Sequence, residues 1–211
     1  MKVLLLVVGL MVLCGSSATS QTMSLAVLEN GECTRSFDVV SGEVFTVVTL
    51  LDTDGHEASA AEWVQTELLL TSPGVFRLGG SVNSCPTCLV IDFPPVNGEW
   101  VVPFGACIPS TEQLVLIQLP YLDVGGYIAD DLVLTIRGLQ PGDSQPSSFD
   151  GSPGFFDCAN IGIPASMAGG DAWETGSGVV VPSGALVLNP TPPLVVGAEG
   201  QPMSYLKARY R

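Results

Sequence analysis

Basic residues are scarce in this chain, and histidine is almost missing. Lys and Arg number 7 against 21 Asp and Glu, with one His among 211 residues. A protein that neutralises nucleic-acid phosphates needs clustered Lys and Arg, so this balance argues against a nucleic-acid partner. A single histidine, His56, leaves little room for a multi-histidine metal site or for histidine-based catalysis.

Charged residues of both signs together make up only 13% of the chain, whereas hydrophobic residues make up 46%. This composition is unlike that of a typical intrinsically disordered protein. The 24 Gly and 16 Pro interrupt the chain too often for long helices. The sequence therefore favours short strands joined by turns.

The N-terminus has the pattern of a secretory signal peptide. Lys2 is followed by an apolar run over residues 3–14 and by small residues over 15–20. The run is shorter than the roughly 20 residues of a membrane span, so we expect cleavage after Ser20. No later run reaches 18 uninterrupted apolar residues. We therefore expect a protein without a membrane span, secreted to the periplasm or the extracellular medium.

Cysteine use agrees with export. The cysteines beyond the signal are Cys33, Cys85, Cys88, Cys107 and Cys158. An oxidising compartment favours disulfides, and an odd number leaves one thiol free or paired between chains. We predict a Cys107–Cys158 disulfide, which would tie a strand end to a long loop. Cys85 and Cys88 form a Cys-Pro-Thr-Cys motif, interpreted as structural because a βαβ redox context is missing.

Apolar runs of strand length recur between turn signals. This spacing predicts an all-β fold, an antiparallel β-sandwich such as an immunoglobulin-like jelly roll, with about nine or ten short strands. Residues 57–62 favour a short helix instead, with Asp54 as its cap. The expected strands are residues 23–28, 44–51, 63–70, 75–78, 88–93, 100–104, 113–119, 132–137, 179–181 and 185–188.

We expect one sandwich domain over residues 21–189. Within it, segment 138–171 is rich in Gly, Pro, Ser and Asp, and its three phenylalanines predict that it packs back onto the sandwich. Residues 190–211 form a Pro-rich tail that we expect to be disordered. The tail ends in a basic cluster made of Lys207, Arg209 and Arg211.

The turn at residues 52–57, Asp-Thr-Asp-Gly-His-Glu, is the candidate metal site. Hard cations prefer several carboxylates on a tight turn, so we name Asp52, Asp54 and Glu57 as candidate calcium ligands. The full EF-hand pattern is missing here. A turn that ends strand 44–51 explains the Asp-Gly pair equally well. No other cofactor is expected.

The sequence contains no complete catalytic constellation. Gly-Asp-Ser at residues 142–144 matches the start of a serine-esterase motif, but the single histidine lies upstream of it. We therefore expect a protein that is not an enzyme. Five aromatic residues offer flat faces to sugar rings, with core packing as the alternative. They are Trp63, Trp100, Trp173, Tyr121 and Tyr127.

Several short motifs resemble a known group. They are Gly-Glu-Val-Phe-Thr-Val at 42–47, the run into Ser-Pro-Gly at 68–76, Phe-Gly-Ala-Cys at 104–107 leading into the strand at 114–117, and Phe-Asp-Cys at 156–158. In this layout the chain resembles uncharacterised secreted bacterial proteins with a cohesin-like or carbohydrate-binding-like β-sandwich. The resemblance covers roughly residues 23–188 and transfers no site residue.

From composition, export and this resemblance together, we expect a non-catalytic binding or adhesion module of the cell surface or medium. Its partner would be an extracellular protein or a polysaccharide. The alternatives are a dedicated glycan-binding module, a calcium-stabilised structural module and an unrecognised hydrolase.

Overall fold

The computed structural model describes residues 21–78, 98–109, 113–168 and 171–192. The predicted signal peptide, Cys85 and Cys88, the expected strand 88–93 and most of the predicted tail lie outside the described residues. Within them no helix is long and apolar enough to cross a membrane.

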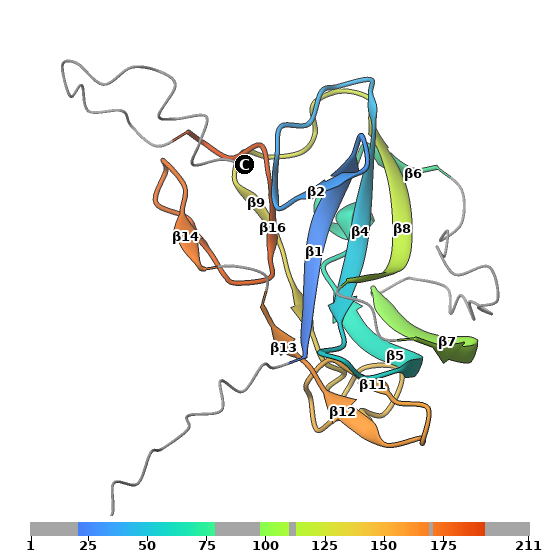
Figure 1. Ribbon diagram of the computed structural model, residues 1–211. Helices are drawn as coiled ribbons and strands as arrows, with labels where there is room; N and C mark the ends of the chain where they lie inside the picture. The colour runs from blue at the N-terminus through green and yellow to red at the C-terminus, as the bar shows by residue number, and fades with distance from the viewer. Residues whose placement is uncertain (1–20, 79–97, 110–112, 169–170, 193–211) are drawn as a thin grey trace, which may run out of the picture.

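One layer of the fold is an antiparallel sheet whose central strands run side by side in Figure 1. In spatial order these are β1 (Thr22–Glu29), β4 (Val44–Asp52), β8 (Leu114–Asp123) and β6 (Val75–Arg77). Two short strands extend the sheet beyond β1. They are β2 (Glu32–Thr34), which is antiparallel to it, and β13 (Ser166–Met167), which is parallel to it.

The second layer is built around β5, which has partners on both edges. On one side lies β7, and on the other lie β10 and β11, with β12 beyond β11. Their bounds are Ala58–Gln65 for β5, Glu99–Ile108 for β7, Ile136–Arg137 for β10, Gly154–Phe156 for β11 and Gly162–Pro164 for β12.

A third group of strands continues this layer. Strand β9 leads through Thr135 into β10, and β16 pairs antiparallel with β9 and parallel with β3. Strands β14 and β15 form a small separate hairpin that projects from the body in Figure 1. The bounds are Ser36–Phe37 for β3, Leu132–Leu134 for β9, Trp173–Glu174 for β14, Val180–Val181 for β15 and Leu186–Leu188 for β16.

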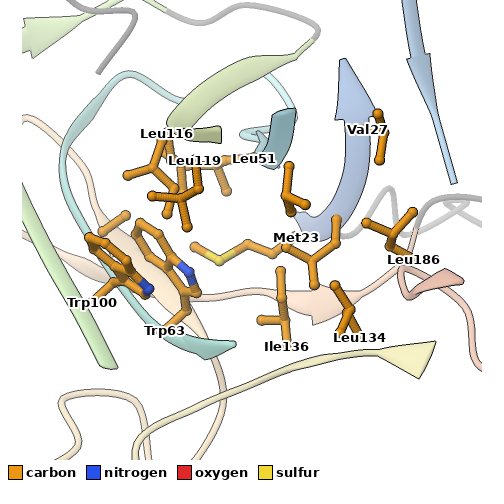
Figure 2. Close-up of a cluster of buried hydrophobic side chains, with 14 of the residues drawn as sticks. Met23, Val27, Leu51, Trp63, Trp100, Leu116, Leu119, Leu134, Ile136 and Leu186 are labelled. Atoms are coloured by element: carbon orange, nitrogen blue, oxygen red, sulfur yellow. The ribbon is translucent and has the colours of Figure 1, made fainter. Parts of the chain in front are cut away.

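The hydrophobic core lies between the two layers. Strand β4 sends Phe45, Val47 and Leu51 into it, as the period of two along a strand requires. Trp63 and Trp100, both buried, stack with ring centroids 6.1 Å apart. Figure 2 shows these two rings side by side among aliphatic side chains from both layers. The all-β antiparallel sandwich predicted from the sequence is confirmed.

The predicted helix at residues 57–62 is wrong, because Ala58–Gln65 is strand β5. Helix propensity is a weak preference, and here three partner strands and a buried position override it. Within the described residues the helix is α1 (Leu68–Thr71), which the side chain of Glu67 caps by accepting from the Leu69 N–H. The expected strand at 63–70 therefore ends at Gln65.

The loop-rich segment at 138–171 packs back onto the sandwich, as predicted. Phe155 is fully buried in the main core, and Phe149 is buried against Phe156 with ring centroids 5.0 Å apart. The segment also contributes the short strands β11, β12 and β13. These raise the number of strand segments in the described chain above the nine or ten that we expected.

The predicted disulfide between Cys107 and Cys158 is present. It joins the end of β7 to the turn between β11 and β12. The two cysteines are 51 residues apart in sequence. Cys33 is free and exposed on β2. The bridge therefore links the long segment to strand β7 of the same sheet, in addition to the pairing of β11 with β5.

Candidate functional site

An exposed apolar row crosses three strands at one end of the first layer. Val44 of β4 pairs with Leu122 of β8, and Leu122 pairs with Phe76 of β6. The neighbouring residue along each strand belongs to the core, so alternation places the row on the outer face of the sheet. Val44 is 56% exposed and Phe76 is 54% exposed.

A second row lies directly beside the first. Thr46 pairs with Pro120, and the Pro120 carbonyl accepts a hydrogen bond of 2.8 Å from the N–H of Leu78. Leu78 is also exposed. We call the six positions of the two rows the β4–β8–β6 face. None of them carries a charge, although the chain holds 21 acidic residues and a net charge of −14.

The apolar character of the outer side continues along β4. Ala26, Val48 and Leu50 form a second, buried cluster there, separate from the main core. The sheet is therefore apolar on both sides at β4. An antiparallel sheet with one solvated side normally alternates apolar and polar residues instead.

Asp123 fixes the loop that borders the β4–β8–β6 face. Its buried carboxylate accepts hydrogen bonds from three backbone N–H groups, those of Gly125 (3.1 Å), Tyr127 (3.0 Å) and Ile128 (3.2 Å). Its carbonyl oxygen accepts from the N–H of Gly42 at 2.7 Å, which holds the turn before β4 against the loop. Tyr127 is left exposed on this loop.

Two opposing effects act on the pKa of the Asp123 carboxyl. Burial raises this pKa, and hydrogen bonds from backbone N–H groups, those of Tyr127 and Gly125 foremost, lower it. The net pKa lies below the usual value because the N–H groups favour the charged form. Asp123 is therefore a structural carboxylate that is held ionised.

The candidate calcium residues lie on the turn that connects the two layers. The Asp54 N–H donates to Oδ1 of Asp52 at 2.9 Å, and both Asp54 and Gly55 have positive φ. In the described chain, the group of three potential ligands whose donor atoms lie within 4.8 Å of one another is Glu57 with Cys107 and Cys158. Those two cysteines form the disulfide. The structure does not gather Asp52, Asp54 and Glu57 in this way, and calcium at this turn stays a prediction.

Calcium binding at this turn would have a measurable effect on stability. A ligand present at 100 times its Kd stabilises the native state by about 2.7 kcal/mol. Millimolar calcium should then raise the Tm of the mature chain above its value in chelator, and a D52N/D54N variant should lose that increase. Equal Tm values with calcium and with chelator would contradict the prediction.

The sequence motif at 142–144 does not form a catalytic group. The N–H of Ser144 donates to both Glu99 carboxylate oxygens at 3.0 Å, and its hydroxyl donates to Oε1 of Glu99 at 3.2 Å. His56 lies elsewhere, against the ring of Phe155 with centroids 6.4 Å apart. Ser144 therefore fastens the turn at residues 140–143, in which the Asp143 N–H donates to the Gln140 carbonyl at 3.0 Å, to strand β7.

The five aromatic residues considered for sugar stacking do not form a common platform. Trp63, Trp100 and Tyr121 are each at most 1% exposed and belong to the core. Trp173 is partly buried on β14, and Tyr127 lies on the loop after β8. Core packing is therefore the role of Trp63, Trp100 and Tyr121.

The β4–β8–β6 face was not identified from the sequence, although a signal was present. Strand β4 reads Val-Phe-Thr-Val-Val-Thr-Leu-Leu-Asp, with apolar residues at adjacent positions 47–48 and 50–51. Such a run predicts burial on both sides of a strand rather than one solvated side. The partners of the strand could not be read from the sequence, so the rows across it could not be assembled.

Comparison with known proteins finds a likeness in fold only. No family model matches the chain, and no curated protein matches it. A cohesin module from a family 33 glycoside hydrolase of Clostridium perfringens has a TM-score of 0.44 and 7% identity, covering 81% of this chain and 97% of that one. The crystal structure of a CaDoc0917–CaCohA2 complex gives a TM-score of 0.43 and 12% identity, with 69% and 94% covered. The structural comparison thus finds the cohesin-like resemblance that the sequence indicated.

Proposed function

We propose that this chain is an exported, non-catalytic binding module that recognises a protein partner through the β4–β8–β6 face. The observation that carries the proposal is an exposed, uncharged surface on a strongly acidic molecule. Contiguous apolar patches on soluble proteins mark interaction sites, and interface cores are depleted of charge. Phe76, on the edge strand β6, is the main anchor, because exposed aromatic residues supply much of the binding energy at such surfaces.

A protein partner fits this face better than a polysaccharide does. Sugar rings stack on exposed flat aromatic side chains, and two of the three tryptophans, Trp63 and Trp100, are buried in the core. The face instead offers aliphatic side chains and one phenylalanine ring, which suit the apolar side chains of another protein. The acidic remainder of the surface would repel an anionic partner and favour a neutral or basic one.

Export supports the same proposal. The N-terminal sequence has the pattern of a signal peptide, and the Cys107–Cys158 disulfide suits an oxidising compartment. We therefore place the binding module at the cell surface or in the surrounding medium, where the partner would also be found.

Affinity capture tests the proposal. The full mature chain is immobilised and exposed to envelope and secreted fractions of the producing cell, beside F76D and I161D variants. Ile161 is the matched control, because it is a similarly exposed apolar residue on the distant turn between β11 and β12. We expect one protein to be retained by the wild type and by I161D and lost with F76D. Equal retention by all three chains, or no retained protein, would contradict the proposal.

A further inference from the structure

A groove lies next to the β4–β8–β6 face, on the side of β1 and β3. Its volume is about 440 Å³. Its apolar lining includes the buried Val27 and Phe45 at the floor, the partly buried Phe37 and the exposed Val40 and Val44. Three exposed carboxylates, Glu29, Asp38 and Glu43, stand around them. An apolar floor with acidic groups at its rim fits a peptide that combines aromatic or aliphatic residues with positive charge.

The acidic rim lacks a cation within the described chain. Glu29 lies directly opposite Glu32 on the β1–β2 pair, and like charges in that position destabilise a sheet. The single ion pair among described residues is Arg137–Asp143, far from the groove in sequence. The other two described arginines do not line the groove, because Arg35 interacts with Asp171 and Arg77 lies on β6 near Tyr121. The rim therefore favours a cation supplied from outside the described residues.

The remaining cations beyond residue 20 lie at the C-terminus of the chain, which ends in Tyr-Leu-Lys-Ala-Arg-Tyr-Arg. This segment, residues 205–211, has three basic residues alternating with apolar ones. Its side chains carry a charge of +3, opposite in sign to the −3 that Glu29, Asp38 and Glu43 contribute at the rim. Its two tyrosines and one leucine match the apolar floor.

The chain leaves the sandwich beside the groove. The Asn189 N–H donates to the Phe37 carbonyl at 2.9 Å, and the Val39 N–H donates to Oδ1 of Asn189 at 2.8 Å. Thr191 is held next, through its N–H and its hydroxyl, by the carboxylate of Asp131, both at 2.7 Å. From Pro192 to Lys207 there are 15 residue steps, which can span up to roughly 50 Å. The groove lies well within that reach.

We propose that the groove binds the C-terminal segment 205–211 of the same molecule, with Lys207 and the two terminal arginines facing the acidic rim. A tether of this length gives an effective concentration in the millimolar range, so weak contacts suffice for occupancy. The ionic part of the binding must weaken with salt, because the Debye length shrinks from about 10 Å at 0.1 M to about 3 Å at 1 M. Val44 belongs to both the groove and the β4–β8–β6 face, so the bound segment would border the partner-binding surface.

Zero-length cross-linking tests this proposal on the full mature chain. Lys207 is the one lysine after residue 20, so carbodiimide coupling of a lysine amine to a carboxylate reports the position of the segment. At low protein concentration and low salt, we expect monomeric products in which Lys207 is joined to Glu29, Asp38 or Glu43. Coupling at these residues should exceed that at other exposed acids by about tenfold and should fall to the common level in 1 M salt.

Charge variants complete the test. In D38N/E43Q, coupling of Lys207 to Glu29 should fall at least about fivefold, because the segment is no longer held at the rim. The matched control E57Q/D150N removes two exposed acids outside the groove and should leave that coupling unchanged. Coupling spread evenly over exposed acids, coupling found only in covalent dimers, or equal coupling in both variants would overturn the proposal. Because none of these variants alters the β4–β8–β6 face, the outcome is independent of partner capture.

Discussion

Replacing both Cys107 and Cys158 by alanine is expected to lower the free energy of unfolding by about 4 kcal/mol. The bridge closes a loop between residues 51 apart, and loop-closure entropy for that length gives this value. Cys107 is exposed and Cys158 is partly buried, so little packing is lost with the sulfur atoms. The loss therefore comes mainly from the greater freedom of the unfolded chain. Urea unfolding of the mature chain and of C107A/C158A measures it.

The matched control for the disulfide is C33A. Cys33 is exposed and free, so its removal should change the unfolding free energy by less than about 0.5 kcal/mol. Reduction of the wild-type chain should reproduce most of the loss seen in C107A/C158A. A double variant within 1 kcal/mol of the wild type, on the order of an ordinary surface substitution, would contradict the prediction.

The second large effect is expected at Asp123. Its replacement by alanine leaves three backbone N–H groups without their acceptor, in a loop whose residues 124–127 are exposed and whose Ile128 is buried. Each unsatisfied buried group costs about 1–3 kcal/mol, and partial access to water reduces the sum, so we expect a loss of about 3 kcal/mol. D123N keeps one oxygen acceptor and should lose less. Urea unfolding of both variants, with D38A as an exposed control, measures the difference.

The Asp123 contribution should also depend on pH. Its folded pKa is below the unfolded value of about 3.9, so its stabilising effect is present above pH 4 and is lost as the pH falls through the folded pKa. The wild type and D123A should therefore differ most near neutral pH and converge in acid. A difference that stays constant down to the acid-unfolding range, or no difference at pH 7, would show that the carboxylate does not hold the loop.

The class of fold could be predicted from the sequence because the strands of this chain show either alternating or continuous apolar residues between turn signals. Residues 132–137 alternate and 44–51 form an apolar run, and both are strands. The Cys107–Cys158 pair was also predictable, since it joins a strand end to a loop that had to be fastened. These features depend on local pattern and on chain length, which the sequence contains directly.

The wrong helix prediction and the two surfaces that the sequence did not reveal have one cause. In each case, pairing with strands distant in sequence decides the structure. Residues 58–62 have the composition of a helix, yet strand partners on both edges of β5 make them extended. The β4–β8–β6 face depends on the register between residues about 40 to 80 positions apart, which no local pattern fixes. The groove similarly forms only when β1 pairs with β4 and Phe37 of β3 packs against Phe45. Such pairings are set by the whole core rather than by any one segment.

The most direct measurement of the central claim is the dissociation constant of the captured partner for the wild type, V44D and V180D. The two variants make the same chemical change at similarly exposed valines, 56% and 64%, one on the β4–β8–β6 face and one on β15. We predict that V44D weakens binding at least about tenfold, a loss of about 1.4 kcal/mol, and that V180D binds as the wild type does. Equal dissociation constants for all three chains would contradict the assignment of this face as the binding surface.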